Sequence, residues 1–295
     1  MVFKNYYKKS VFEIGGLLAA LYFGYWMIHY ITLVMVADLF IIPTSSMEPT
    51  LIPGDRVIVD KTIMGARIYT DFRFQKGGQR LECLRTKGRR QLRHNDVVVF
   101  NFPRPKWEEI CFEINNVWCK RILALPGDTL FVKNGFYSNN NYAGTLGVVE
   151  QQKTLSECPD SVLIAHDGFI TMYLWPVPWT IKNMGPYYIP RKGDVIQVGF
   201  NDVSLYHDIV ELETNKELTW NRETDSAMLD GQTITNYTFK GNYYFLGGDN
   251  VLNSMDSRYW GLVPEDYIVG VVKMIGYSRD EETRRTRWDR VWKRL

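Results

Sequence analysis

The longest apolar stretch of the chain lies near its N-terminus. Between Glu13 and Asp38 no residue carries a formal charge. A helix rises about 1.5 Å per residue, so this stretch is long enough to cross a hydrocarbon core of about 30 Å. The pattern predicts a transmembrane anchor over residues 14–37. It favours this over a buried core helix and over the shorter apolar region of a cleavable signal peptide.

Charges on either side of the stretch predict its orientation. Lys4, Lys8 and Lys9 precede it, whereas Arg56 is the only basic residue within about twenty positions after it. Flanks rich in Lys and Arg remain in the cytoplasm. We therefore expect residues 1–13 to form a cytoplasmic N-terminus. The rest of this single-pass protein is expected on the outer (periplasmic or extracellular) side of the inner (plasma) membrane.

Beyond the anchor, short segments rich in Val, Ile, Phe and Tyr are separated by Gly, Pro and Asn. They cover residues 56–61, 96–102, 129–135, 194–200 and 242–248. Such segments predict strands. Asn134-Gly135 also predicts a tight hairpin, because a type I′ turn needs two residues with positive φ. The pattern therefore predicts a mainly β protein, with one transmembrane helix followed by an all-β catalytic unit.

Composition narrows the possible functions. The chain has 295 residues and a net charge of +2, which gives no global basic surface for nucleic acid. No zinc-protease, P-loop or dinucleotide-binding motif occurs, so we expect neither a metal nor a cofactor. Cys111 and Cys119 bracket a short segment that a disulfide is able to staple. A bridge and two free thiols both remain open there.

Candidate chemistry lies in two apolar segments. Ser46 follows the anchor in a Pro-Thr-Ser turn, and a serine nucleophile needs a base within hydrogen-bond reach. The histidines lack the companions of a charge-relay triad, but Lys120 lies in an apolar strand segment. Strand alternation puts Lys120 on one face with Trp118 and Ile122, where burial lowers a lysine pKa. The alternative is a surface lysine on an edge strand.

Three motifs occur in a recognisable order: Ser-Met-Glu-Pro-Thr from Ser46, Lys-Arg-Ile-Leu-Ala-Leu-Pro-Gly-Asp from Lys120, and Gly-Asp-Asn-Val-Leu-Asn-Ser-Met-Asp-Ser-Arg from Gly248. Together they resemble the type I signal (leader) peptidases, which are membrane-bound Ser-Lys proteases. Cytosolic autoproteases of the repressor type share the dyad, but the apolar anchor and the Asp-Ser-Arg motif argue against them.

The resemblance implies a membrane-bound serine endopeptidase that cleaves N-terminal signal peptides from exported preproteins. It selects Ser46 over Ser45 as the nucleophile, because the family serine precedes Met, and it makes Lys120 the general base. The backbone N–H of Ser46 and the hydroxyl of Thr44 would form the oxyanion hole. Partners implied are preprotein signal peptides, the lipid bilayer and the protein-export translocon, and no nucleic acid.

Further roles follow from the same resemblance. Ser254, with Ser257 as the alternative, would orient the lysine. The supporting ion pairs would be Asp256 with Arg258 and Asp249 with Arg121. Candidate walls of the substrate site are Ile42, Met47 and Trp118. Val251-Leu252 departs from the family, in which many members carry Arg-Asp.

The resemblance also divides the chain into parts. Residues 38–128 and 240–277 would form the catalytic β domain, and residues 129–239 an inserted second β domain. A continuous sandwich is the alternative. In residues 278–295, Trp288, Val291, Trp292 and Leu295 fall at helical spacing among basic residues. We expect a basic amphipathic C-terminal helix, which rests either on lipid or on the domain.

A different class of function competes with the enzyme: a catalytically inactive, membrane-anchored β-domain that binds exported peptides or envelope partners. Both functions require peptide binding. Only the enzyme requires Ser46 Oγ and Lys120 Nζ to lie within hydrogen-bond distance.

Overall fold

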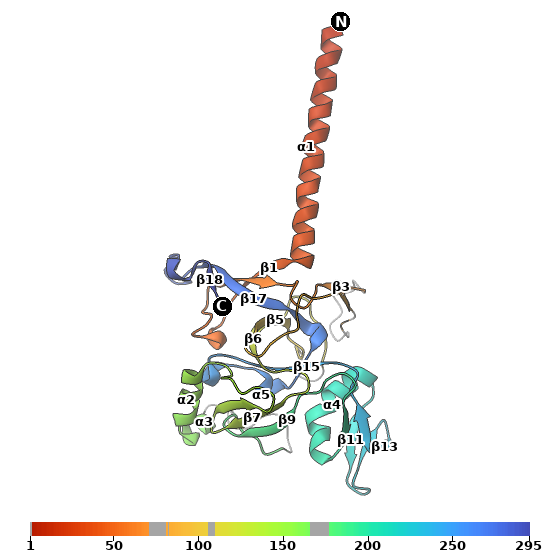
Figure 1. Ribbon diagram of the computed structural model, residues 1–295, viewed down its shortest axis with the longest axis vertical. Helices are drawn as coiled ribbons and strands as arrows, with labels where there is room; N and C mark the ends of the chain where they lie inside the picture. The colour runs from red at the N-terminus through yellow and green to blue at the C-terminus, as the bar shows by residue number, and fades with distance from the viewer. Residues whose placement is uncertain (1, 71–80, 82, 106–109, 166–176) are drawn as a thin grey trace.

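A long N-terminal helix stands away from a β-rich body (Figure 1). The structure, a computed structural model, describes residues 2–70, 81, 83–105, 110–165 and 177–295. Helix α1 (Val2–Met35) contains 22 residues, Ile14–Met35, that are apolar enough to span a membrane and are not buried against the body. The predicted anchor ends two residues later than this, because Ala37 already begins strand β1 (Ala37–Ile41).

One antiparallel sheet forms the centre of the body. Its strand order is β1-β2-β17-β5-β6-β15-β16, with β18 added beside β17. The bounds are β2 (Asp55–Asp60), β17 (Ile268–Ser278), β5 (Val97–Asn101), β6 (Val117–Ala124), β15 (Tyr243–Gly247), β16 (Val263–Pro264) and β18 (Lys293–Arg294). Early, middle and late parts of the chain therefore meet in one sheet, which brings the three sequence motifs together.

Smaller strand groups surround this sheet. They are β3 (Arg67–Tyr69) with β4 (Cys83–Arg85); β7 (Thr129–Lys133) between β8 (Phe136–Asn139) and β9 (Met184–Tyr188); β10 (Val195–Gln197) with β14 (Asn236–Thr238); and β11 (Leu218–Asn221), β12 (Ser226–Leu229) and β13 (Gln232–Ile234). The β7–β8 turn has φ of 48° at Asn134 and 83° at Gly135, as the sequence predicts. The mainly β fold is confirmed.

The predicted inserted β domain also contains helices. α2 (Val149–Glu157), α3 (Asp160–Ala165) and α4 (Phe200–Thr214) lie between residues 129 and 239, so this segment combines helices with its strands. In α4 the buried Val203, Tyr206, Ile209 and Val210 follow a helical spacing, which the strand-like residues just before them obscure. One core cluster contains residues of this segment and of the central sheet, so the segment packs directly on the sheet.

The C-terminal segment is not a helix. Ser278, the expected start, is the last residue of β17, and the chain then passes through a 3₁₀ turn, η4 (Trp288–Arg290), into β18. Two positive φ angles, 58° at Arg284 and 59° at Trp292, are incompatible with a continuous α-helix. Pairing of β18 with β17 replaces the local helical preference, so the helix prediction over residues 278–295 is wrong.

Candidate active site

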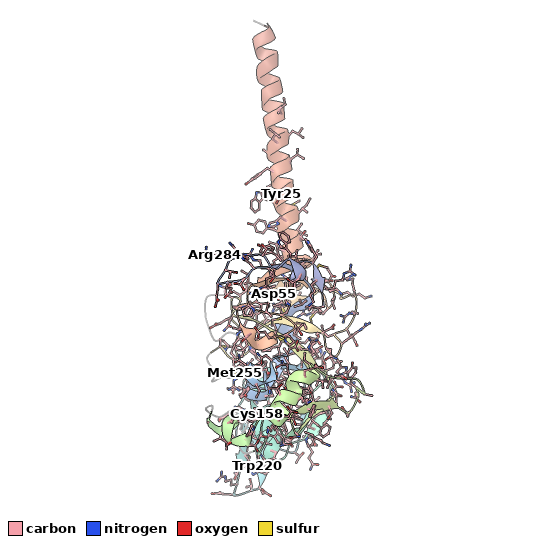
Figure 2. The ribbon with its side chains drawn as sticks, turned by 90° about the vertical axis from the view of Figure 1, so that its left-hand side faces the viewer. Tyr25, Asp55, Cys158, Trp220, Met255 and Arg284 are labelled. Carbon is pink, nitrogen blue, oxygen red and sulfur yellow. The ribbon has the colours of Figure 1, made fainter. Side chains whose placement is uncertain are left out.

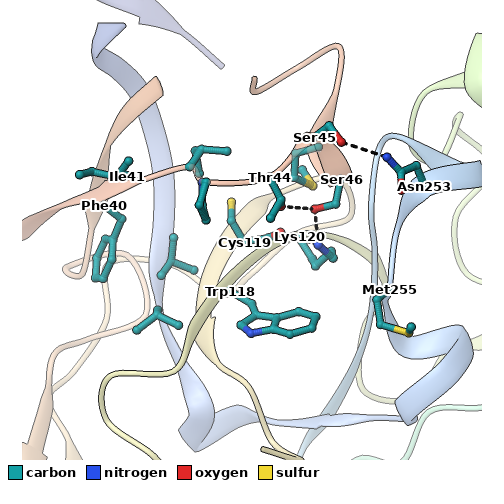
Figure 3. Close-up of a pocket in the computed structure, with 15 residues that line it drawn as sticks. Phe40, Ile41, Thr44, Ser45, Ser46, Trp118, Cys119, Lys120, Asn253 and Met255 are labelled. Carbon is teal, nitrogen blue, oxygen red and sulfur yellow. Dashed lines mark hydrogen bonds between the residues drawn. The ribbon is translucent and has the colours of Figure 1, made fainter. Parts of the chain in front are cut away.

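Ser46 lies on a 3₁₀ turn, η1 (Ser45–Met47), shortly after β1. Met47 and Leu51 are buried in a core cluster together with Ile42, and the Leu51 N–H donates to the Met47 carbonyl at 2.9 Å. Apolar side chains on both sides of the turn therefore fix its backbone. The Ser46 hydroxyl is directed into a pocket (Figure 3).

Lys120 is buried on strand β6. The antiparallel register places Lys120 opposite Val98, with Trp118 opposite Phe100 on the neighbouring strand β5. Only 3% of Lys120 is exposed, so it is not a surface lysine. Burial lowers the pKa of Lys120 below its ordinary value, because desolvation penalises the ammonium form. A larger fraction of the side chain is therefore neutral than in water.

The serine and the lysine are in contact. Lys120 Nζ lies 2.6 Å from Ser46 Oγ and 3.2 Å from the backbone carbonyl of Cys119 (Figure 3). The neighbouring Ser45 hydroxyl instead accepts a hydrogen bond from Asn253 Nδ2 at 3.0 Å. Of the two adjacent serines, Ser46 is thus the one placed beside the amine. A neutral Lys120 amine at this distance is able to take the hydroxyl proton.

Thr44 lies on the same side of the turn. Its Oγ1 is 3.4 Å from Ser46 Oγ, and its backbone is extended, with φ of −128° and ψ of 161°. The hydroxyl and the Ser46 backbone N–H are both potential donors to an oxygen bound beside Ser46.

Ser254 lies near the site but forms no hydrogen bond with the lysine. Its Oγ is buried and has no hydrogen-bond partner among the residues that the structure describes, so the expected bond to Lys120 is not formed. The Gly248 backbone packs closely against Ser254 and the Ser46 backbone. A Cβ at position 248 would be 2.0 Å from Ser254 Oγ and 2.6 Å from the Ser46 carbonyl oxygen. The alternative, Ser257, accepts a hydrogen bond from a backbone N–H of β15 at 3.0 Å.

A buried ion pair stabilises the loop that runs from Gly248 to Arg258. Asp256 and Arg258 form two hydrogen bonds of 2.7 and 2.8 Å, and neither side chain is exposed. Burial would raise the pKa of Asp256, but the Arg258 guanidinium and the Gly248 N–H together hold the pKa below its ordinary value. Asp256 also accepts from the Gly248 N–H at 2.9 Å, and Arg258 donates to the Val251 carbonyl at 2.8 Å. The pair thus fixes both limbs of the loop.

Arg121 makes a second ion pair. Its guanidinium binds Asp249 through two contacts of 2.6 Å, and it also donates to Thr50 Oγ1 at 3.2 Å. Because Arg121 follows Lys120 in the strand, it links the lysine strand to the segment that follows the Ser46 turn.

An apolar pocket of about 320 Å³ opens beside the Ser46–Lys120 contact. The three predicted walls, Ile42, Met47 and Trp118, line it. Residues that the sequence did not indicate also line it: Phe40, Ile41, Val99, Val117, Cys119, Asn253 and Met255. Val99 lies opposite Cys119 in the β5–β6 register, which strand patterns alone do not define.

Cys119 carries a free thiol, so the possible bridge to Cys111 is not formed. Burial raises the pKa of the Cys119 thiol to about 12. The thiol therefore stays protonated at neutral pH and acts as a small apolar wall of the pocket.

Comparison with known proteins decides the family. A family model described as signal peptidase, peptidase S26, matches residues 17–168 and 184–277, which is most of the chain. The chain belongs to the S26 signal peptidase family. It is thus a serine peptidase, and the S26 match includes Ser46, Lys120 and Ser254.

Relatives named signal peptidase I agree with this assignment. The protein from Buchnera aphidicola subsp. Acyrthosiphon pisum is 27% identical over 286 residues, which cover 94% of this chain and 77% of the relative. The protein from Helicobacter pylori strain 26695 is 26% identical over 269 residues, covering 86% and 80%. That of Pseudomonas aeruginosa is 26% identical over 264 residues, covering 84% and 68%.

Proposed function

We propose that this S26 peptidase removes signal peptides from exported preproteins with a Ser46–Lys120 dyad at the membrane surface. The observation that carries the proposal is the 2.6 Å contact between the Ser46 hydroxyl and a buried lysine amine beside an apolar pocket. An inactive peptide-binding domain would have no need of a buried lysine, which costs folding free energy. The contact therefore favours the enzyme over that alternative.

In this mechanism, neutral Lys120 takes the proton of Ser46 as Oγ attacks the scissile carbonyl. The Ser46 N–H and the Thr44 hydroxyl donate to the developing oxyanion. Lys120 then gives the proton to the leaving amine, and a water molecule hydrolyses the acyl-enzyme ester. Small apolar residues before the cut would occupy the pocket walled by Ile42 and Trp118.

We further propose that residues 14–35 anchor the protein with residues 1–13 in the cytoplasm, and that the translocon delivers the substrates. Residues 38–128 and 240–277 would be the catalytic unit, supported by residues 129–239. Exposed apolar side chains lie on the elements near the base of α1: Leu39 and Ile41 on β1, and Trp288 and Trp292 around β18 (Figure 1). Basic residues accompany these tryptophans, as suits an anionic bilayer surface.

The pH dependence of cleavage tests the lysine base. For a preprotein with Ala-x-Ala before its cut, kcat should rise with pH on a limb that lies below the ordinary lysine value of about 10.4, because burial lowers the pKa of Lys120. His94 and His207 pair with Asp128 and Asp208 and should not contribute. His166 lies outside the described residues, and we expect it to be equally dispensable.

The matched controls are single His→Gln variants at positions 94, 166 and 207, each assayed across the same pH range. Their limbs should coincide with that of the unaltered protein. A limb that moves in any of the three would assign the titration to histidine and reject Lys120 as the base.

Fluorescence quenching tests the membrane surface. In the full chain reconstituted into vesicles with brominated lipid, Trp288→Phe with Trp292→Phe should reduce the quenchable tryptophan signal, because both indoles would lie at the headgroup level. Trp220→Phe is the control, since Trp220 lies at the end of the body away from α1 (Figure 2). An unchanged quenchable fraction in the double variant would show that this surface does not reach lipid.

A further inference from the structure

The segment from Ser278 to the C-terminus lies beyond the S26 match, which ends at residue 277. It is nevertheless built into the body. Arg279 and Thr286 pair as an antiparallel bridge, and β18 pairs with β17. The 3₁₀ turn η4 lies between these two attachments, and its last residue, Arg290, is directed inward.

Arg290 is a buried arginine whose Nε and Nη2 both donate to acceptors of the body. Its Nε lies 3.0 Å from Asp55 Oδ1, and its Nη2 lies 2.6 Å from Asp55 Oδ2. The same Nη2 donates to the backbone carbonyl of Thr50 at 2.9 Å. Arg290 is 8% exposed and Asp55 is fully buried, so water does not compete for these bonds. A bidentate guanidinium–carboxylate pair of this kind fixes orientation as well as distance.

The acceptors of Arg290 belong to the limb that returns from the Ser46 turn to β2, residues 50–55. Asp55 Oδ2 also accepts from the Ile52 N–H at 2.9 Å, and Arg287 donates to the Pro53 carbonyl at 2.8 Å. The two ends of the segment that carries Ser46 are joined where the Ile42 N–H donates to the Asp55 carbonyl at 2.8 Å. The C-terminal segment therefore holds the whole return limb.

Thr50 connects this clamp to the lysine strand. Its carbonyl accepts from Arg290, while its hydroxyl accepts from Arg121, the residue after Lys120. Ser46 lies one turn before Thr50. Displacement of Thr50 would thus change the position of the Ser46 turn relative to the strand that carries Lys120. No other part of residues 278–295 reaches this limb with a buried ion pair among the contacts that the structure describes.

We propose that Arg290 is a positioning residue for the peptidase reaction: by clamping Thr50 and Asp55 it holds Ser46 Oγ at Lys120 Nζ. The inference rests on the proposed function of the dyad. It makes the C-terminal segment a part of the catalytic unit, although the S26 match does not include it. A misplacement of about 1 Å at a reacting group can cost about 100-fold in rate.

The test uses the full chain in detergent with a preprotein substrate. When assayed below its melting temperature, Arg290→Met should lower kcat by about 10- to 100-fold. KM should change by less than about threefold, because the pocket walls are not altered. The alkaline limb of kcat should also move towards higher pH, as a displaced Ser46 leaves Lys120 more open to water. Arg290→Lys should recover only part of kcat, because an ammonium cannot replace the planar fork.

Two matched variants separate positioning from loss of stability. Val203→Ala shortens a buried side chain of α4, at the opposite end of the body from β18, and should lower the melting temperature while keeping kcat and the limb (Figure 1). Arg285→Met removes an exposed positive charge from the C-terminal segment and should leave the melting temperature, kcat and its pH dependence unchanged. An Arg290→Met protein whose kcat and alkaline pH dependence are unaltered would overturn the inference. A loss of kcat no larger than that of Val203→Ala would overturn it as well.

Should Arg290→Met fail to fold, Thr50→Val addresses the same link. It removes the hydroxyl bond to Arg121 and keeps the carbonyl bond to Arg290, so kcat should fall several-fold without a large loss of stability. An unaffected kcat would refute the link. Lys120→Met, assayed alongside, separates the two proposals: if it still cleaves, the dyad fails, and if it is inactive while Arg290→Met is normal, only the positioning role fails.

Discussion

Lys120→Met should abolish cleavage and at the same time raise the free energy of unfolding at neutral pH. Loss of the base should lower kcat by about 10,000-fold or more, as for other residues that act together with a nucleophile. Stability should rise because methionine fills a similar volume without a charge to desolvate. Each tenfold by which burial weakens proton binding to Lys120 lowers the free energy of unfolding of the unaltered protein at neutral pH by about 1.4 kcal/mol.

The sign of the pH effect follows from the lowered pKa of Lys120. Between its value in the folded protein and about 10.4, the unfolded chain binds more protons, so the stability of the unaltered protein rises with pH in that window. The advantage of Lys120→Met should therefore be complete below the window and fade towards its upper end. Denaturant unfolding of both proteins at pH 7 and pH 10 measures this.

Ser46→Ala is the matched control for the loss of activity. It should be as inactive as Lys120→Met, with little change in stability, and the double variant should be no worse than either single one. Lys120→Arg should be inactive as well, because arginine stays protonated. Substantial cleavage by a folded Lys120→Met protein would reject the dyad.

Arg258→Met should cause the largest loss of stability. It leaves the Asp256 carboxylate buried without its cation, which typically costs about 3–5 kcal/mol. Cleavage should also fall, because Asp256 holds Gly248 against the Ser46 carbonyl and Ser254. Chemical unfolding and the substrate assay, both carried out on the full chain, measure the two effects.

An exposed ion pair provides the comparison. Lys153 and Glu157 are each 67% exposed, so Lys153→Met should change stability by less than about 1 kcal/mol. Adding Asp256→Asn to Arg258→Met should recover part of the loss, because it removes the uncompensated charge. If Arg258→Met and Lys153→Met proved equally mild, the buried pair would not support the loop as described.

Local patterns were sufficient for much of the fold and site. The apolar run predicts α1, and Asn134-Gly135 predicts its hairpin, because both depend on neighbouring residues only. Alternation along residues 117–124 places Lys120 on the face that carries Trp118 and Ile122. The order of the motifs alone indicates Ser46 and Lys120 as the reacting pair.

Features that depend on distant partners were missed. Trp288 and Trp292 have helical spacing, but the backbone beside them finds a more favourable partner in β17, which no local pattern reveals. The bond expected between Ser254 and Lys120 is not formed, and no local pattern reveals how closely the Gly248 backbone packs on the Ser254 hydroxyl. Val99 and Val117 became pocket walls through strand register alone.

Strand order has a consequence for when the active site is able to form during synthesis of the chain. β2, which follows the Ser46 turn, and β5, which pairs with the Lys120 strand, are not neighbours: each pairs with β17, which lies between them. β17 begins only at Ile268, close to the end of the chain. A partly synthesised molecule thus has no strand to join its two reactive halves. We expect the Ser46–Lys120 contact to form only after Ile268–Ser278 has been synthesised and has paired with both strands.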